Sequence, residues 1–172
     1  MTVLGVGNVL QKDDGFGVYA AMYLESNYRF DPQVEIVNGG VEGIHLYNVI
    51  ERSDAILLLD AVAIDDEPGS IYLIPAEELE SRGLNCGGAH EIGVLQVLDM
   101  MELQGKTIPP TTLLGIVPQH VTFAIDLSKT LMRAFDDYIR VALRFLQRHG
   151  ITATPKSQHT PLRDVIDSVR RL

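Results

Sequence analysis

Apolar and β-branched residues recur along the chain in short runs, and stretches with helical spacing separate these runs. The runs predicted to form strands are Thr2–Val6, Val34–Val37, Ala55–Val62, Ile71–Ile74 and Thr112–Val117. The stretches predicted to form helices are Phe16–Tyr28, Glu42–Glu51, Glu91–Leu103 and a long segment from about Leu127 to His149. Strands that alternate with helices indicate an α/β fold, with helices on both faces of a mostly parallel sheet.

One connection is too short for a parallel crossover, which takes roughly a dozen residues. Between Val62 and Ser70 the chain offers only residues 63–69. The strand Ile71–Ile74 is therefore expected to run antiparallel to the strand before it. The predicted sheet is mixed and five-stranded, with one antiparallel strand.

The long helix has a typical residue at each end. Asp126 is predicted to be its N-cap, and Gly150 is predicted to stop it. A chain of 172 residues and 19.0 kDa fits one compact domain. Residues 1–150 are therefore expected to form a single α/β domain.

Residues 151–172 are expected to form a C-terminal extension of that domain. The segment Ile151–His159 lacks periodicity and is predicted to be a linker. Thr160 and Pro161 then make a typical helix start, and the residues after them have the spacing of a short amphipathic helix. This helix either packs on the domain or waits for a partner, and packing is the favoured alternative.

Composition excludes several classes of partner. The formal net charge is −9 and the pI is near 4.9, which argues against binding to nucleic acid or to anionic membranes. The single cysteine, Cys86, excludes an internal disulfide framework and fits a reducing cytoplasm. The N-terminus does not resemble a signal peptide, and no apolar run approaches the ~20 residues that cross a bilayer. The sequence predicts a soluble, cytoplasmic protein.

The segment Gly5–Gly17 reads GVGNVLQKDDGFG and links the first strand to the first helix. A complete dinucleotide-binding fingerprint would have a third glycine where this chain has Leu10. Asp13 and Asp14 stand at the start of the helix, where two carboxylates would repel a phosphate but could hold a cation. The loop is predicted to face a cation or handle a proton, without a nucleotide cofactor. Asp13 is interpreted as a solvated neighbour of Asp14.

Three side chains are candidates for a shared site. Asp60 ends a buried-type strand, where ligands bind in open α/β sheets, and Asp14 should reach the same edge. His90 opens the helix after a glycine-containing loop. Each has a structural alternative as a turn carboxylate, a helix-dipole partner or a capping histidine. Together, two carboxylates and an imidazole suit nickel, zinc or a similar ion, with positions left open for a partner or water.

Signatures of covalent catalysis are missing from the chain. No G-x-S-x-G elbow occurs, and Cys86 lacks the surroundings of a cysteine-protease nucleophile, so it is interpreted as a free loop thiol. Hydrolysis would therefore need an activated water molecule.

Five blocks, in order, resemble the hydrogenase maturation endopeptidases, which trim the large subunit of nickel–iron hydrogenases. They are Gly5–Gly17, Val34–Gly40 (VEIVNGG), Leu57–Ala61 (LLLDA), His90–Gly93 (HEIG) and Leu113–Pro118 (LLGIVP). The resemblance implies a three-layer α/β/α sandwich around a mixed five-stranded sheet. It also implies a nickel-dependent endopeptidase that removes the C-terminal extension of a hydrogenase large-subunit precursor after nickel insertion.

The resemblance places the family's nickel-recognition residues on Asp14, Asp60 and His90. Nickel would arrive already bound to cysteines of the substrate, so the substrate supplies the metal. The protease would dock onto that metal and cut a nearby peptide bond, and a precursor without nickel would offer nothing to grip.

The chain departs from the family at one motif. Many members carry Asp-Gly-Gly-Thr after the second strand, whereas this chain has Asn38, Gly39 and Gly40 followed by valine. An asparagine cannot act as a general base, although it could orient a water molecule or hold the scissile carbonyl. Gly39 and Gly40 are interpreted as turn residues that could also contact substrate. Asp14 or Asp60 is then the better candidate for the catalytic base.

Two other functions fit part of the pattern. The same general fold could carry an aminopeptidase or a nucleoside-phosphorylase-like hydrolase, because fold alone does not determine function. The chain could also be a non-catalytic chaperone that delivers nickel to a hydrogenase.

Overall fold

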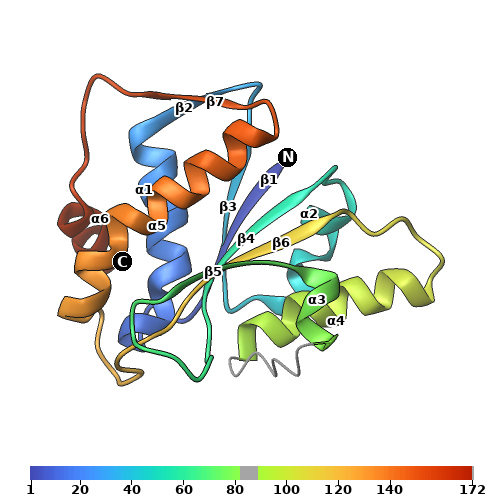
Figure 1. Cartoon of the computed structure of the whole chain (residues 1–172), viewed down its shortest axis with the longest axis horizontal. Helices are drawn as coiled ribbons and strands as arrows, with labels where there is room; N and C mark the ends of the chain where they lie inside the picture. Colours follow the sequence, from blue (N-terminus) through green and yellow to red (C-terminus); the bar gives the residue numbers. More distant parts are fainter. Residues whose placement is uncertain (82–88, 172) are drawn as a thin grey trace.

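The computed structural model describes residues 1–81 and 89–171, except for the side chains of Ile44 and of residues 79–81 and 89–93. Its centre is a five-stranded sheet with the strand order β3-β1-β4-β6-β5 (Figure 1). The strands are β1 (Thr2–Val6), β3 (Glu35–Gly40), β4 (Ile56–Ala61), β5 (Ile71–Pro75) and β6 (Thr111–Ile116). All neighbours pair in parallel except β5, which pairs antiparallel with β6. The mixed sheet predicted from the short connection is confirmed.

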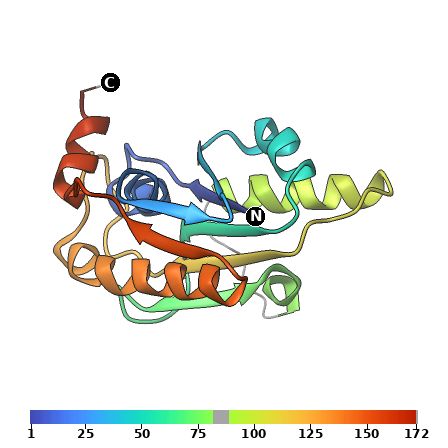
Figure 2. The same ribbon diagram turned by 90° about the horizontal axis from the view of Figure 1, so that it is seen from above.

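Helices cover both faces of this sheet and make the three-layer sandwich (Figure 2). On one face α1 (Phe16–Asn27), α5 (Lys129–Arg148) and α6 (Leu162–Val169) pack over a core that includes Leu57 and Leu59. On the other face α2 (Tyr47–Glu51) and α4 (Ala89–Leu103) pack over a core that includes Ile56 and Leu58. A short helix, α3 (Ala76–Ser81), follows β5. No helix in the described residues is both long and apolar enough to cross a bilayer.

The helix predicted over Glu42–Glu51 forms only in its second half. Gly43 has a φ of 44°, which an α-helix cannot accommodate, and a 3-10 turn, η2 (Gly43–Leu46), precedes α2. The predicted helix is therefore wrong for its first turn.

The predicted N-cap of the long helix is also wrong. Ser128 caps α5, and its hydroxyl accepts a hydrogen bond from the Leu131 backbone N–H at 3.3 Å. Asp126 lies two residues earlier and forms ion pairs with Arg163 and Arg170 instead. Gly150, with a φ of 77°, follows the helix as predicted.

The segment predicted to be a linker contains a strand. β7 (Thr152–Pro155) pairs antiparallel with β2 (Tyr28–Asp31), a strand that the sequence reading missed, and the two lie side by side in Figure 2. After it, α6 buries Val165 and Ile166. The C-terminal helix therefore packs on the rest of the chain, as favoured from its sequence.

Two glycines allow the first helix to approach the sheet. A Cβ atom on Gly17 would lie 2.1 Å from the Leu59 carbonyl oxygen, so α1 can touch the end of β4 only through a glycine. Gly7 has a φ of 129°, and a Cβ atom there would lie 1.9 Å from the Asp14 carbonyl oxygen. The glycines thus bring the 3-10 turn η1 (Lys12–Gly15) against the carboxyl ends of β1 and β4.

Candidate functional site

Asp60 is a buried carboxylate at the carboxyl edge of the central strand. It is 1% exposed, and its Oδ1 accepts a hydrogen bond of 2.7 Å from the Ala61 backbone N–H. Side chains alternate along a strand, so Asp60 projects from the same face of β4 as Ile56 and Leu58, the face that α4 covers. Its side chain is thereby directed to the layer that contains α4.

The negative charge of Asp60 affects the pKa of Tyr138, a residue on the other face of the sheet. Tyr138 of α5 is fully buried and donates a hydrogen bond of 2.6 Å to the Leu114 carbonyl oxygen. Burial, and then the negative charge of Asp60, raise the pKa of Tyr138 well above its ordinary value. The tyrosine therefore stays neutral and cannot itself serve as a base near neutral pH.

Asp14 lies in η1 at the same edge of the sheet. It is partly exposed, and its Oδ2 accepts a hydrogen bond of 3.0 Å from the Asn8 backbone N–H. This bond fixes the carboxylate over the loop that follows β1. The turn η1, which carries Asp14, contacts β4, the strand that carries Asp60. That the two carboxylates share one site stays a prediction.

Asp13 differs from its sequence interpretation, because it is not a solvated neighbour of Asp14. It is fully buried, and it accepts hydrogen bonds from the backbone N–H groups of Gln119, His120 and Ser128 at 3.0, 2.8 and 2.6 Å. The carboxylate therefore ties the segment between β6 and α5 to the candidate site. Sequence reasoning missed this role, for which the chain offers no local signal apart from the acidic pair itself.

The third candidate ligand can be placed only by its backbone. His90 lies in the first turn of α4, but its side chain is outside the described residues. Cys86 is also outside them. Among the side chains that are described, no group of three His, Cys, Asp or Glu residues could hold a metal ion. The proposed triad of Asp14, Asp60 and His90 therefore stays a prediction.

The segment 38–40, which departs from the family motif, lies at the end of β3, the strand that pairs with the other side of β1. Asn38 is exposed near the end of β3, and the Gly39 carbonyl oxygen accepts a hydrogen bond of 3.0 Å from the Glu42 N–H. Gly40 has a φ of 48°. The two glycines therefore form a turn, and their part in substrate binding stays a prediction.

A cavity of about 330 Å³ lies between this turn and the loop after β1, residues 7–10. Asn8, Leu10, Asn38 and Val41 are among the residues that line it. Most of the lining is apolar, and Asn8 and Asn38 add polar side chains to it. The cavity suits an apolar side chain of a bound molecule.

Comparison with known proteins identifies the family of the chain. The family model described as "Hydrogenase maturation protease" matches residues 18–145. The Hydrogenase 2 maturation protease of Escherichia coli is 30% identical over 155 residues, which cover 90% of this chain and 94% of that protein. The hydrogenase expression/formation protein HoxM of Azotobacter vinelandii is also 30% identical, over 90% of this chain and 75% of its own.

Solved structures give the same result. The hydrogenase maturating endopeptidase HybD from E. coli superposes with a TM-score of 0.83 at 30% identity, covering 91% of this chain and 97% of its own. The chain belongs to the hydrogenase maturation protease family.

Proposed function

From this family membership we propose that the chain is an endopeptidase that removes the C-terminal extension of a nickel–iron hydrogenase large-subunit precursor. One relative, which matches over 90% of this chain and 94% of its own length, is named a hydrogenase 2 maturation protease. The precursor is thus the expected partner, and the edge of the sheet that holds Asp14 and Asp60 is the expected place of cleavage.

We further propose that the enzyme recognises nickel carried by the substrate. The observation that supports this most strongly is the shared direction of Asp60 and α4. Asp60 projects from the α4 face of the sheet, and His90 lies in the first turn of α4. Together with Asp14, they would offer two carboxylates and an imidazole to a borderline ion whose other ligands belong to the precursor.

Cleavage needs a base that activates water, because the chain lacks an evident nucleophile. Asp14 and Asp60 are the candidates, and each already accepts a backbone N–H that fixes its orientation. A carboxylate held in this way could act as a general base that takes a proton from water. Asn38 would orient that water or hold the scissile carbonyl, since its amide cannot act as a base.

The test is the length of the product. Incubation with nickel-loaded precursor should convert it to a shorter large subunit, and mass spectrometry of the released peptide should identify one cleavage position. A precursor that binds but keeps its full mass would instead support a non-catalytic nickel chaperone.

A further inference from the structure

Two cavities lie along the outer strand of the sheet, β3. β3 is the last strand on its side of the sheet, and α1 lies over its inner face. Residues about one helical turn apart on α1 and alternate residues on β3 contribute to their lining. We use the name β3 groove for the two cavities and the stretch of α1 and β3 between them. Val18, Met22, Asn38 and Gly40 line one cavity, and Glu25 and Ile36 line the other.

One end of the β3 groove is the apolar cavity beside the candidate site. Val41 and Leu10 both line it and are 56% and 45% exposed, so they bring apolar surface to the same place. Val169, which belongs to α6 near the C-terminus of this chain, also lines the cavity. This end therefore suits an apolar side chain of a bound peptide.

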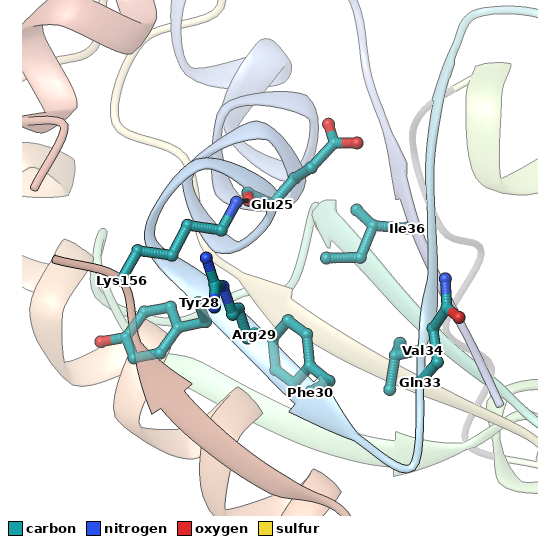
Figure 3. Close-up of a pocket in the computed structure, with 8 residues that line it drawn as sticks. All are labelled: Glu25, Tyr28, Arg29, Phe30, Gln33, Val34, Ile36 and Lys156. Atoms are coloured by element: carbon teal, nitrogen blue, oxygen red, sulfur yellow. Dashed lines mark hydrogen bonds between the residues drawn. The ribbon is translucent and has the colours of Figure 1, made fainter. Parts of the chain in front are cut away.

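The other end is a second cavity, of about 390 Å³ (Figure 3). Phe30, Val34 and Ile36 contribute apolar surface, and Arg29 and Lys156 bring two cations to the rim. The Lys156 ammonium group donates to the Glu25 carbonyl oxygen at 2.6 Å, while the Glu25 carboxylate points away from it in Figure 3. In a chain of net charge −9, this end suits an anionic group.

The two cavities share no lining residue but follow one another along both elements. On α1, Met22 lines the cavity beside Val41 and Glu25 lines the cavity beside Arg29. On β3, Asn38 lines the former and Ile36 the latter. With a rise of about 3.3 Å per residue, the path from Gly40 to Ile36 is about 13 Å. An extended peptide would cover it with about four residues.

The strand itself offers backbone groups to such a peptide. The Glu35 N–H bonds to the Met1 carbonyl oxygen of the chain's first residue, inside the sheet. Because hydrogen bonding alternates along a parallel strand, the N–H and C=O groups of Ile36 and Asn38 face away from β1. An outer strand of this kind can accept an added strand.

We propose that the β3 groove binds the C-terminal extension of the precursor as an added strand, antiparallel to β3. An apolar side chain of the extension occupies the cavity beside Val41. A carboxylate about four residues further on lies between Arg29 and Lys156. The direction follows from the proposed function, on which this inference rests, since cleavage at the acidic edge leaves the extension running toward Arg29.

Kinetics of two variants test the groove. Val41→Asp should raise KM for nickel-loaded precursor roughly tenfold, because it places a charge in an apolar cavity, while kcat changes less. Arg29→Glu should also raise KM, and more so at low ionic strength. Leu103→Asp, at the far end of α4, and Arg133→Glu, on the surface of α5, are the controls and should match the wild type. Wild-type KM values in both groove variants, with an active wild-type enzyme, would overturn the groove and leave the proposed function standing.

A binding measurement decides the groove even if no precursor is cut. A synthetic peptide with the sequence of the extension should shift the amide resonances of Ile36 and Asn38 in the 15N spectrum of the full chain. Shifts confined to other residues, or none at saturating peptide, would overturn the inference. Failure of the proposed function would appear separately, as an unchanged precursor mass with the wild-type enzyme.

Two modified peptides identify the anionic group. An amidated C-terminus removes the terminal carboxylate, and replacing Asp and Glu by Asn and Gln removes the side-chain carboxylates. Weaker binding of one of them assigns the contact with Arg29 and Lys156 to that source. Unchanged affinity of both would overturn the anionic end of the proposal.

Discussion

The Asp13 Oδ1 atom lies 2.6 Å from the backbone nitrogen of Ser128, although 115 residues separate the two in sequence. Ser128 is also the N-cap of α5, so one buried carboxylate joins the turn that carries Asp14 to the start of the longest helix. The candidate site is therefore built on a long-range contact and not on the glycine loop alone.

Replacing Asp13 should cost more stability than replacing any exposed aspartate. Asp13→Asn keeps the shape but removes the charge that holds three backbone N–H groups, and it should lower the free energy of unfolding by about 2–4 kcal/mol. Urea denaturation measures this value. Asp136→Asn, on the exposed side of α5, is the control and should stay within about 0.5 kcal/mol. A similarly small effect at Asp13 would contradict its structural role.

The ion pairs of Asp126 should make the docking of α6 depend on pH. Burial acts to raise the pKa of Asp126, but the Leu127 N–H and the charges of Arg163 and Arg170 outweigh it and lower the pKa below its ordinary value. A lowered pKa in the folded state stabilises the fold above the unfolded value near 3.8, and this contribution disappears as the pH falls through the folded value.

Asp126→Asn should therefore lose stability near neutral pH and lose less on acidification. The loss should be about 1 kcal/mol, because the pairs are partly exposed. Thermal unfolding at pH 7 and at pH 3 would measure it. The same difference between variant and wild type at both pH values would show that the ion pairs contribute nothing.

The approach of α1 to β4 should not tolerate a methyl group. Gly17→Ala would place its Cβ 2.1 Å from the Leu59 carbonyl oxygen and should displace η1, with a loss of several kcal/mol or failure to fold. Gly105→Ala is a useful comparison, because its Cβ would meet no atom within 4 Å and only its φ of 67° is unfavourable. Circular dichroism and melting temperature compare the two. Wild-type stability of Gly17→Ala would contradict the packing described here.

Asp60→Asn separates metal recognition from catalysis. If Asp60 only holds nickel, the variant should cut slowly and recover at high enzyme concentration, because weakened binding can be saturated. If Asp60 also activates water, the rate should stay low at any concentration. Single-turnover cleavage of loaded precursor measures the difference. An unchanged rate would remove Asp60 from the site.

The sequence predicted the buried strands well because continuous apolar runs such as Ile56–Leu59 leave little choice of environment. It failed where burial depends on distant partners. Asp13 resembles any exposed acidic residue until the segment from Gln119 to Ser128 folds over it. Asp126 has the side chain of an N-cap, but Arg163 and Arg170 draw it away from the helix.

The short outer strands were missed for a different reason. β2 continues directly from α1, so the helical pattern masks the alternation of Tyr28 and Phe30 with the exposed residues between them. That alternation was the available signal. Its partner β7 is mostly exposed and has no apolar face of its own from which a strand could be predicted.

The central claim is that cleavage depends on nickel in the precursor and not on nickel in the enzyme. A cleavage assay that compares nickel-loaded with nickel-free precursor, using chelator-washed enzyme, tests it most directly. Chelator-washed wild-type enzyme should cut nickel-loaded precursor at the full rate. The same enzyme should leave nickel-free precursor intact. Product formation is followed by mass spectrometry. Full cleavage of the nickel-free precursor would contradict the account.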